Sequence, residues 1–241
     1  PAANEKEGAF LEGIHVYGVS GLPEALQILR GERIKEPVKI SFEQYRSCEK
    51  HTDEPDFIDI CGMETAKRAA EIAVSGRHNI LLIGPAGSGK TMLARRMSGI
   101  MPQPDVDECL ELTKIYSVCG LLDREQSVVT RRPFRAPHHS VTAVALTGGG
   151  KIPMPGEITL AAGGILFLDE LPEFSRQSLE ALREPLEDRR VVIARLGHSY
   201  EYPADCIFVA AMNPCRCGFY PDDRKCRCTA QDIRRYLEKI S

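Results

Sequence analysis

The sequence predicts an α/β fold with a mainly parallel sheet. Three apolar runs, at residues 79–83, 164–168 and 206–213, suit buried strands because they are short and rich in Ile, Leu, Val and Phe. Helical segments separate these runs, and such alternation is typical of parallel strands joined by helices. The 241 residues are enough to bury a sizeable core in one large domain or two small ones.

The first part of the chain predicts a connecting segment. Residues 1–59 hold 12 Asp or Glu against 7 Lys or Arg, and their apolar spacing indicates only one short helix near residues 22–29. The sequence ETAKRAAEIAVS, from residue 64 to 75, is a strong helix former that ends at Gly76. We therefore expect a linker over residues 1–55 and a compact domain over residues 56–241.

The elements after this helix also follow from periodicity and turn residues. Ser175 can cap a helix, because its hydroxyl can accept from a free amide of the first turn. Three leucines share one face of that helix and are assigned to core packing. The expected elements are helices at 90–100 and about 107–118, a glycine-rich hairpin or exposed loop at 147–164, a helix at 175–188 and a hairpin at 189–203.

Composition and charge exclude several classes of protein. The net charge of -3 argues against a uniformly basic nucleic-acid coat, but it says nothing about local basic patches. No apolar run approaches the roughly 18 residues of a membrane helix, so a protein with membrane-spanning helices and a membrane partner are not expected. The nine cysteines are odd in number and mostly scattered, and no signal segment opens the chain, so a reducing cytoplasm is the expected compartment.

The segment GPAGSGKT matches the phosphate-binding pattern G-x-x-x-x-G-K-[ST] between an apolar strand and a helix start. Its amides can cradle phosphate oxygens, while Lys90 brings positive charge to the β- and γ-phosphates and Thr91 offers a hydroxyl to Mg²⁺. A chance glycine-rich turn is the alternative, and the flanking strand and helix count against it. The candidate nucleotide-binding residues are Gly84, Pro85, Ala86, Gly87, Ser88, Gly89, Lys90, Thr91 and Met92.

Hydrolysis also needs an acid that holds the metal and a group that activates water. Asp169 ends the second apolar run and would hold Mg²⁺ across a crevice from the phosphate loop, and Glu170 can act as general base. Asn213 ends the third run and could orient the attacking water. The plainer alternatives are two acids that end a strand at the solvent and an Asn before Pro in an ordinary turn.

These motifs resemble Walker A, Walker B and sensor 1 of an AAA+ ATPase. More specifically, HNILLIGPAGSGKTMLARR, RPFRAPHHS, GEITLAAGGILFLDELPEF, LEALREPLED and AAMNPCRCG resemble segments of the Mg-chelatase-like ComM (YifB) family, over nearly all of residues 56–241. The PHHS and NPCxCG patterns make the resemblance specific to that branch.

The resemblance implies further features of the fold. A helix-2 insertion would fall at 147–157, and the hairpin before sensor 1 at 190–203. Residues 1–55 would be the link from a Lon-like N-terminal domain, while the arginine finger, sensor 2 and helical lid would lie outside this chain. The adenine-facing segment would fall at Ile60, Cys61 and Gly62.

The same resemblance implies a DNA motor. It would be a ring, expected to be a hexamer, that binds ATP between subunits and acts as a branch-migration helicase in recombination and natural transformation. Two other functions stay open. One is an ATPase subunit that drives magnesium insertion into a porphyrin, as in the wider family, and the other is a module that uses ATP only for assembly or remodelling.

Four cysteines near the C-terminus form the pattern C-x-C-x8-C-x-C in a short polar loop. Four thiolates suit tetrahedral Zn²⁺, although C-x-C is a less usual spacing than C-x2-C. Reduced surface thiols are the alternative, and a disulfide is not expected in the cytoplasm. The candidate ligands are Cys215, Cys217, Cys226 and Cys228.

A basic region lies before and within the glycine-rich stretch, and residues 215–241 add seven Lys or Arg against four Asp or Glu. In the pore of a ring these residues would offer phosphate contacts to DNA, whereas a solvated basic face or ion pairs with a neighbouring subunit explain them equally well. His138 and His139 would point in different directions on a strand, so structural hydrogen bonds are expected of them rather than metal binding. The candidate nucleic-acid contacts are Arg131, Arg132, Arg135 and Lys151.

Overall fold

The computed structural model describes residues 2, 5–9, 13–38, 56–122, 128–150, 153–195 and 198–240. Contacts divide the chain into two compact units. The first consists of Pro1–Asp53 with Asp105–Thr130, and the second of Glu54–Pro104 with Arg131–Ser241. The second unit contains the central sheet and all the described candidate site residues.

Within the first unit, the described helices are α1 (Glu5–Gly8), α2 (Leu22–Leu29) and α6 (Val106–Val118). The helix α2 confirms the short helix that the leucine spacing predicts. The helix α6 begins at a capping box, in which the Asp105 carboxylate accepts from the Glu108 amide at 2.8 Å and the Glu108 carboxylate accepts from the Asp105 amide at 3.0 Å. These two bonds explain why the helix starts where it does.

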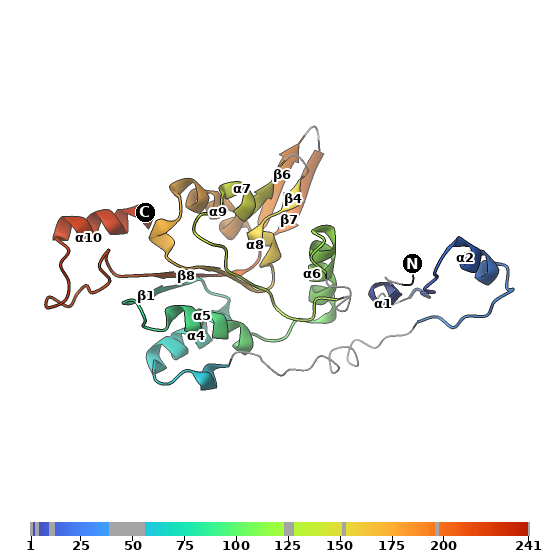
Figure 1. Ribbon diagram of the computed structural model, residues 1–241, viewed down its shortest axis with the longest axis horizontal. Coiled ribbons are helices and arrows are strands. Elements are labelled where there is room, and N and C mark those ends of the chain that lie inside the picture. The colour runs from blue at the N-terminus through green and yellow to red at the C-terminus, as the bar shows by residue number, and fades with distance from the viewer. Residues whose placement is uncertain are drawn as a thin grey trace. The chain divides into compact units, whose positions relative to one another are not determined.

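A parallel four-stranded sheet in the order β1-β8-β5-β2 forms the centre of the second unit (Figure 1). It confirms the α/β fold with a mainly parallel sheet. Because all strands run the same way, their carboxyl ends meet at one edge, where Ile83 pairs with Met212. The strands are β1 (Ile80–Ile83), β2 (Phe134–Arg135), β5 (Ile165–Leu168) and β8 (Ile207–Met212).

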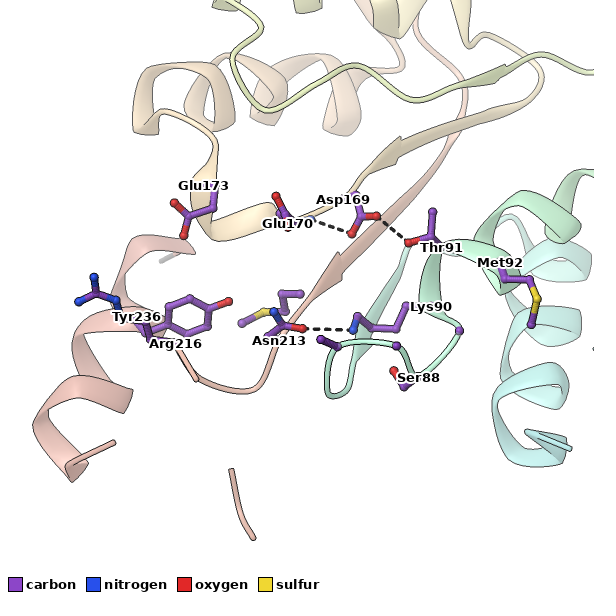
Figure 2. Close-up of a pocket in the computed structure, with 14 residues that line it drawn as sticks. Ser88, Lys90, Thr91, Met92, Asp169, Glu170, Glu173, Asn213, Arg216 and Tyr236 are labelled. Atoms are coloured by element: carbon purple, nitrogen blue, oxygen red, sulfur yellow. Dashed lines mark hydrogen bonds between the residues drawn. The ribbon is translucent and has the colours of Figure 1, made fainter. Parts of the chain in front are cut away.

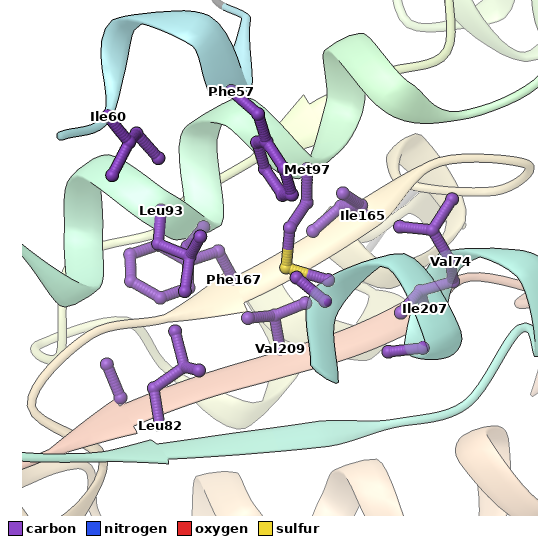
Figure 3. Packing of buried hydrophobic residues seen from close by; sticks show 14 residues of the cluster. Phe57, Ile60, Val74, Leu82, Leu93, Met97, Ile165, Phe167, Ile207 and Val209 are labelled. Carbon is purple, nitrogen blue, oxygen red and sulfur yellow. The ribbon is translucent and has the colours of Figure 1, made fainter. Parts of the chain in front are cut away.

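Side chains of the central strands alternate between two hydrophobic cores, one on each face of the sheet. On one face, Ile165 and Phe167 pack with α4 (Glu64–Gly76) and α5 (Lys90–Met97), as Figure 3 shows. The 3-10 helix η2 (Phe57–Asp59) adds Phe57 to the same core. The helix expected at 90–100 is therefore confirmed, with its last turn as the 3-10 helix η3 (Ser98–Ile100).

The opposite face is covered by α7 (Ala143–Thr147), α8 (Glu157–Leu160) and α9 (Arg176–Asp188), and Leu166 and Leu168 of β5 point into this second core. Figure 1 shows these helices across the sheet from α4 and α5. The helix α9 starts as expected at Ser175, whose hydroxyl accepts from the Ser178 amide at 3.1 Å. The second unit is therefore a sheet between two helical layers.

The glycine-rich stretch differs in part from its prediction. A short hairpin of β3 (Gly148–Gly149) and β4 (Met154–Pro155) is present, and it joins α7 to α8. The prediction of an exposed loop is wrong for the residues that follow the hairpin, because Ile158, Thr159 and Leu160 of α8 are buried. The helices α7 and α8 have five and four residues, too few to show a helical spacing of apolar residues, and neither was predicted. The arrangement of two helices joined by a hairpin agrees with the insertion expected at 147–157.

The later elements complete the unit. The hairpin expected at 189–203 is confirmed as β6 (Arg190–Arg195) and β7 (His198–Pro203), and the 3-10 helix η4 (Leu171–Glu173) follows β5. The helix α10 (Ala230–Leu237) and the 3-10 helix η5 (Glu238–Ile240) near the C-terminus were not predicted. Across the described ranges, every helix is too short or too polar to cross a bilayer.

Candidate nucleotide-binding site

A pocket of about 630 Å³ opens at the carboxyl edge of the sheet. This volume lies within the usual range for small-ligand sites, about 300 to 1,000 Å³. The phosphate loop lines it with residues 86–92, and the ends of β5 and β8 contribute three of the four predicted catalytic side chains. Figure 2 shows this arrangement, which brings together Lys90, Asp169, Glu170 and Asn213.

The phosphate loop has the conformation that anion binding requires. Gly87 and Gly89 have φ angles of 74° and 82°, a region that favours glycine, and Gly89 precedes the first residue of α5. The Ser88 hydroxyl is buried and has no hydrogen-bond partner among the described residues. A buried donor without a partner is costly, and a phosphate oxygen would satisfy it. The loop therefore fits the phosphates of a nucleotide.

Lys90 lies where it can meet the terminal phosphates. Its Nζ donates to the carbonyl oxygens of Gly84 at 2.8 Å and Pro85 at 2.9 Å, and to Oδ1 of Asn213 at 3.3 Å. Partial burial lowers the pKa of Lys90, and the nearby Asp169 carboxylate opposes this shift. The ammonium is thus held on the pocket side of the loop by acceptors that phosphate oxygens can replace.

Thr91 and Asp169 form the candidate magnesium site. The Thr91 hydroxyl donates to Oδ2 of Asp169 at 2.7 Å, although the two residues are 78 positions apart in sequence. A hydroxyl oxygen and a carboxylate oxygen at this spacing are hard ligands of the kind that Mg²⁺ uses together with phosphate oxygens. The residues present therefore fit Mg²⁺, and the order of the strands produces the pair.

Glu170 lies beside this pair with its carboxylate in solvent. Its backbone has a φ of 54°, and its amide donates to Oδ1 of Asp169 at 2.9 Å (Figure 2). Oε2 of Glu170 is 3.7 Å from Nδ1 of His139, close enough for an ion pair when the histidine is protonated. An exposed carboxylate next to the candidate metal-binding acid is suited to accept a proton from water.

The paired histidines correct one expectation. His138 and His139 lie in a turn rather than on a strand, and their ring centroids are 3.9 Å apart. His138 has the structural contact that was expected, 2.9 Å from Nδ1 to the Ser140 hydroxyl. His139 instead faces Glu170, a proximity that sequence alone could not show because 30 residues separate the two.

Two pocket residues come from the C-terminal segment and were not predicted. Arg216 follows Cys215, and Tyr236 lies on α10. Partial burial raises the pKa of the Tyr236 phenol, while a hydrogen bond from the Asn213 amide acts the other way. The pattern RRYLEKIS is the only sequence signal for Tyr236, and nothing local in it points to a nucleotide.

The predicted adenine-facing segment lies near the loop but does not line the described pocket. Ile60 is 2% exposed and packs in the first core, while Cys61 is exposed and Gly62 has a φ of 70°. The following residue, Met63, reaches the loop, since a Cβ on Gly89 would lie 3.2 Å from its sulfur. The base-binding role of these residues stays a prediction.

The predicted nucleic-acid contacts are placed unevenly. Arg132 donates to the carbonyl oxygens of Pro102 and Gly163, the latter at 2.6 Å. Arg135 makes a two-pronged ion pair with Glu157 at 2.7 and 2.8 Å. These bonds give Arg132 a structural role within the chain, and they pair Arg135 with an acid of the same chain rather than of a neighbouring subunit. Arg131 is exposed, and Lys151 lies outside the described residues.

The four candidate zinc ligands do come together. Cys215, Cys217, Cys226 and Cys228 have sulfur atoms that all lie within 4.8 Å of one another. Backbone amides of Phe219 and Arg227 lower the pKa of Cys217 to about 6, because they donate to its sulfur. The four cysteines that the sequence places in one loop are therefore one cluster in space.

The parallel sheet, the phosphate loop and the acids beside it define a nucleotide-binding domain of the AAA+ class of P-loop proteins. Residues 56–241 match the family described as magnesium chelatase, subunit ChlI. The chain belongs to this family, and within it resembles the ComM and YifB proteins.

Curated relatives support this placement. The chain is 50% identical to the uncharacterized protein YifB of Salmonella typhimurium over 186 residues, which is 77% of this chain and 36% of that protein. It is 43% identical to the competence protein ComM of Haemophilus influenzae over 244 residues, 99% of this chain and 46% of that protein. The uncharacterized protein Rv2897c of Mycobacterium tuberculosis is 41% identical over 242 residues, 100% of this chain and 47% of that protein. The chain thus spans less than half the length of these relatives.

Proposed function

We propose that the chain is the ATP-hydrolysing core of a ring-forming DNA motor of the ComM type. The observation that carries the ATPase part is the contact between Thr91 and Asp169 at 2.7 Å, with Glu170 next in sequence and Lys90 bonded to Asn213. These side chains supply candidates for phosphate binding, metal binding, proton acceptance and water orientation at one edge of the sheet, which supports the proposal.

Each residue has a distinct role in this proposal. The loop amides, the Ser88 hydroxyl and the Lys90 ammonium bind phosphate oxygens. Thr91 and Asp169 would hold Mg²⁺, which when bound neutralises charge on the phosphates. Glu170 takes a proton from the attacking water, and Asn213 orients that water and responds to the terminal phosphate. The sequence also suggests Zn²⁺, besides ATP and Mg²⁺. In this proposal Zn²⁺ would bind to the cysteine cluster and would take no part in ATP hydrolysis.

The DNA part of the proposal has separate support. It comes from the resemblance to ComM proteins and from the basic residues around the glycine-rich hairpin, where Arg131 and Lys151 stay the candidate phosphate contacts. Arg132 and Arg135 already bond within the chain, so their replacement would disturb the fold as well as any DNA contact. A ring, expected to be a hexamer in the cytoplasm, is part of the same proposal.

Steady-state ATPase across a salt series, with and without single-stranded and branched DNA, tests the proposal. The assay is run on this chain and, separately, on a longer natural protein that contains it. We expect DNA to stimulate turnover, and the stimulation to fade with salt because phosphate contacts release counterions. Turnover that ignores DNA but responds to a porphyrin-binding partner would support the chelatase alternative, which the family match makes the second candidate. ATP-dependent assembly with negligible turnover would support a remodelling module.

A further inference from the structure

The cysteine cluster has the dimensions of a zinc site. The sulfur of Cys215 lies 3.4 Å from that of Cys217 and 3.9 Å from that of Cys226, and the last two are 3.6 Å apart. Tetrahedral Zn²⁺ with Zn–S bonds of about 2.3 Å places its sulfur ligands about 3.8 Å from one another. With Cys228 in the same group, four sulfurs surround a space that one ion would fill.

The loop that carries these cysteines has little else to hold it. Residues 215–228 contain no helix or strand, and Cys215 and Gly218 are its buried residues. Such a loop cannot be ordered by hydrophobic packing, whereas a metal ion can link its two ends. The amide of Tyr220 donates to the Cys215 sulfur at 3.4 Å, as backbone amides often do around metal-bound thiolates.

The charges of the loop also suit a metal thiolate centre. One Zn²⁺ with four thiolates carries a net charge of about -2, and nearby cations stabilise such a centre. The loop supplies more cations than acids, with Asp222 and Asp223 opposed by Arg216, Arg224, Lys225 and Arg227. The loop's own charge therefore offsets that of the loaded site.

The loop that carries the cluster adjoins three parts of the pocket wall. Cys215 follows two residues after Asn213, which bonds to Lys90. Gly218 lies near the phosphate loop, since a Cβ on it would lie 3.9 Å from the Ala86 amide nitrogen. Cys228 precedes Thr229, the cap of the helix α10 that carries Tyr236.

We propose that the four cysteines bind one structural Zn²⁺, and that this ion holds the loop against the phosphate loop so that nucleotide affinity depends on zinc. The inference uses the nucleotide site of the proposed function but is independent of DNA and of turnover. Failure of DNA to stimulate ATPase would leave it untouched, and loss of zinc would leave the DNA question open.

The first test combines metal analysis with ADP binding. The chain, purified without chelator, is expected to contain one zinc per molecule, and a strong chelator should remove the zinc and weaken ADP binding about tenfold, equivalent to about 1.4 kcal/mol. Zinc added back should restore the affinity. Cys217→Ser should lose both properties, while Cys119→Ser, which changes a thiol outside the cluster, should keep both.

A second variant separates the metal from the contact it supports. Gly218 has a φ of 84°, so Gly218→Ala strains the loop where it meets Ala86 but keeps all four thiols. We expect it to retain zinc and to bind ADP several-fold more weakly. Substitution with Co²⁺ should give the visible absorption of a tetrahedral thiolate site even in a variant that binds no ADP.

Two results would overturn the proposal. Zinc well below one per chain, with no Co²⁺ spectrum, would show that the cysteines are reduced thiols. Stoichiometric zinc whose removal leaves ADP affinity unchanged in a folded chain would show a metal site with no effect on the nucleotide pocket.

Discussion

Lys90 and Glu170 lie in the same pocket, but their charged groups have different surroundings. The Lys90 ammonium is held by two loop carbonyls and Asn213, so it is positioned before any phosphate arrives. The Glu170 side chain is 62% exposed, and its carboxylate faces His139. The side chain therefore contributes little to the stability of the fold. Substitutions at these two positions should therefore separate nucleotide binding from hydrolysis.

Lys90→Ala is expected to weaken ATP and ADP binding by about a hundredfold, because hydrogen bonds from a charged group to phosphate are among the strongest in a site. Titration with a fluorescent nucleotide measures this change. Lys114→Ala, at an exposed lysine of α6, is the matched control and should bind normally. Equal affinity in the Lys90 variant and the control would remove Lys90 from the phosphate site.

Glu170→Gln is expected to keep ATP affinity and to lower turnover by about 10²-fold or more, since the amide has the same shape but cannot accept the proton. Binding and single-turnover hydrolysis, measured on the same preparation, separate the two effects. Normal hydrolysis by this variant would show that another group activates the water.

At the scale of elements, most helices and strands begin and end for local reasons, whereas the shortest ones depend on their neighbours. The helix α9 starts at Ser175, whose hydroxyl accepts from the Ser178 amide, and it packs Leu182 into the second core. The strand β2 has two residues and exists because it pairs with β5, Phe134 with Ile165. Capped helices should thus respond to single local substitutions.

Ser175→Ala is expected to lower the free energy of unfolding by about 1 kcal/mol, because it leaves an amide of the first turn of α9 without its acceptor. Urea unfolding followed by circular dichroism measures the change. Ser98→Ala is the control, since the Ser98 hydroxyl donates to the Arg95 carbonyl in the last turn of α5 rather than accepting from a first-turn amide. A control variant as unstable as Ser175→Ala would mean that the cap is not the cause.

At the scale of the whole chain, the pocket and both hydrophobic cores are built from residue 57 onward. The family match begins at residue 56, close to the boundary that the change in composition predicts. The contacts nevertheless group residues 105–130 with the first 53 residues. These facts make the N-terminal segment a direct test of what the nucleotide site requires.

A chain shortened to residues 56–241 is expected to fold and to bind ADP within about twofold of the longer chain, as a domain with its own core should. Thermal unfolding with and without ADP, together with nucleotide titration, checks both properties. A folded but non-binding product would mean that residues before 56 contribute to the site.

The features that could be predicted from the sequence are those whose causes lie within about ten neighbouring residues. The phosphate loop, the buried strands, the capped helix after Ser175 and the acids that end β5 could all be predicted, because periodicity, glycine and capping are local signals. Features that need partners far away in the sequence became visible only in the folded structure. The order β1-β8-β5 brings Asn213 to Lys90, a turn brings His139 to Glu170, and Glu157 engages Arg135. Such pairings depend on how strands and helices pack across the sheet, and short-range patterns in the sequence carry little information about that packing.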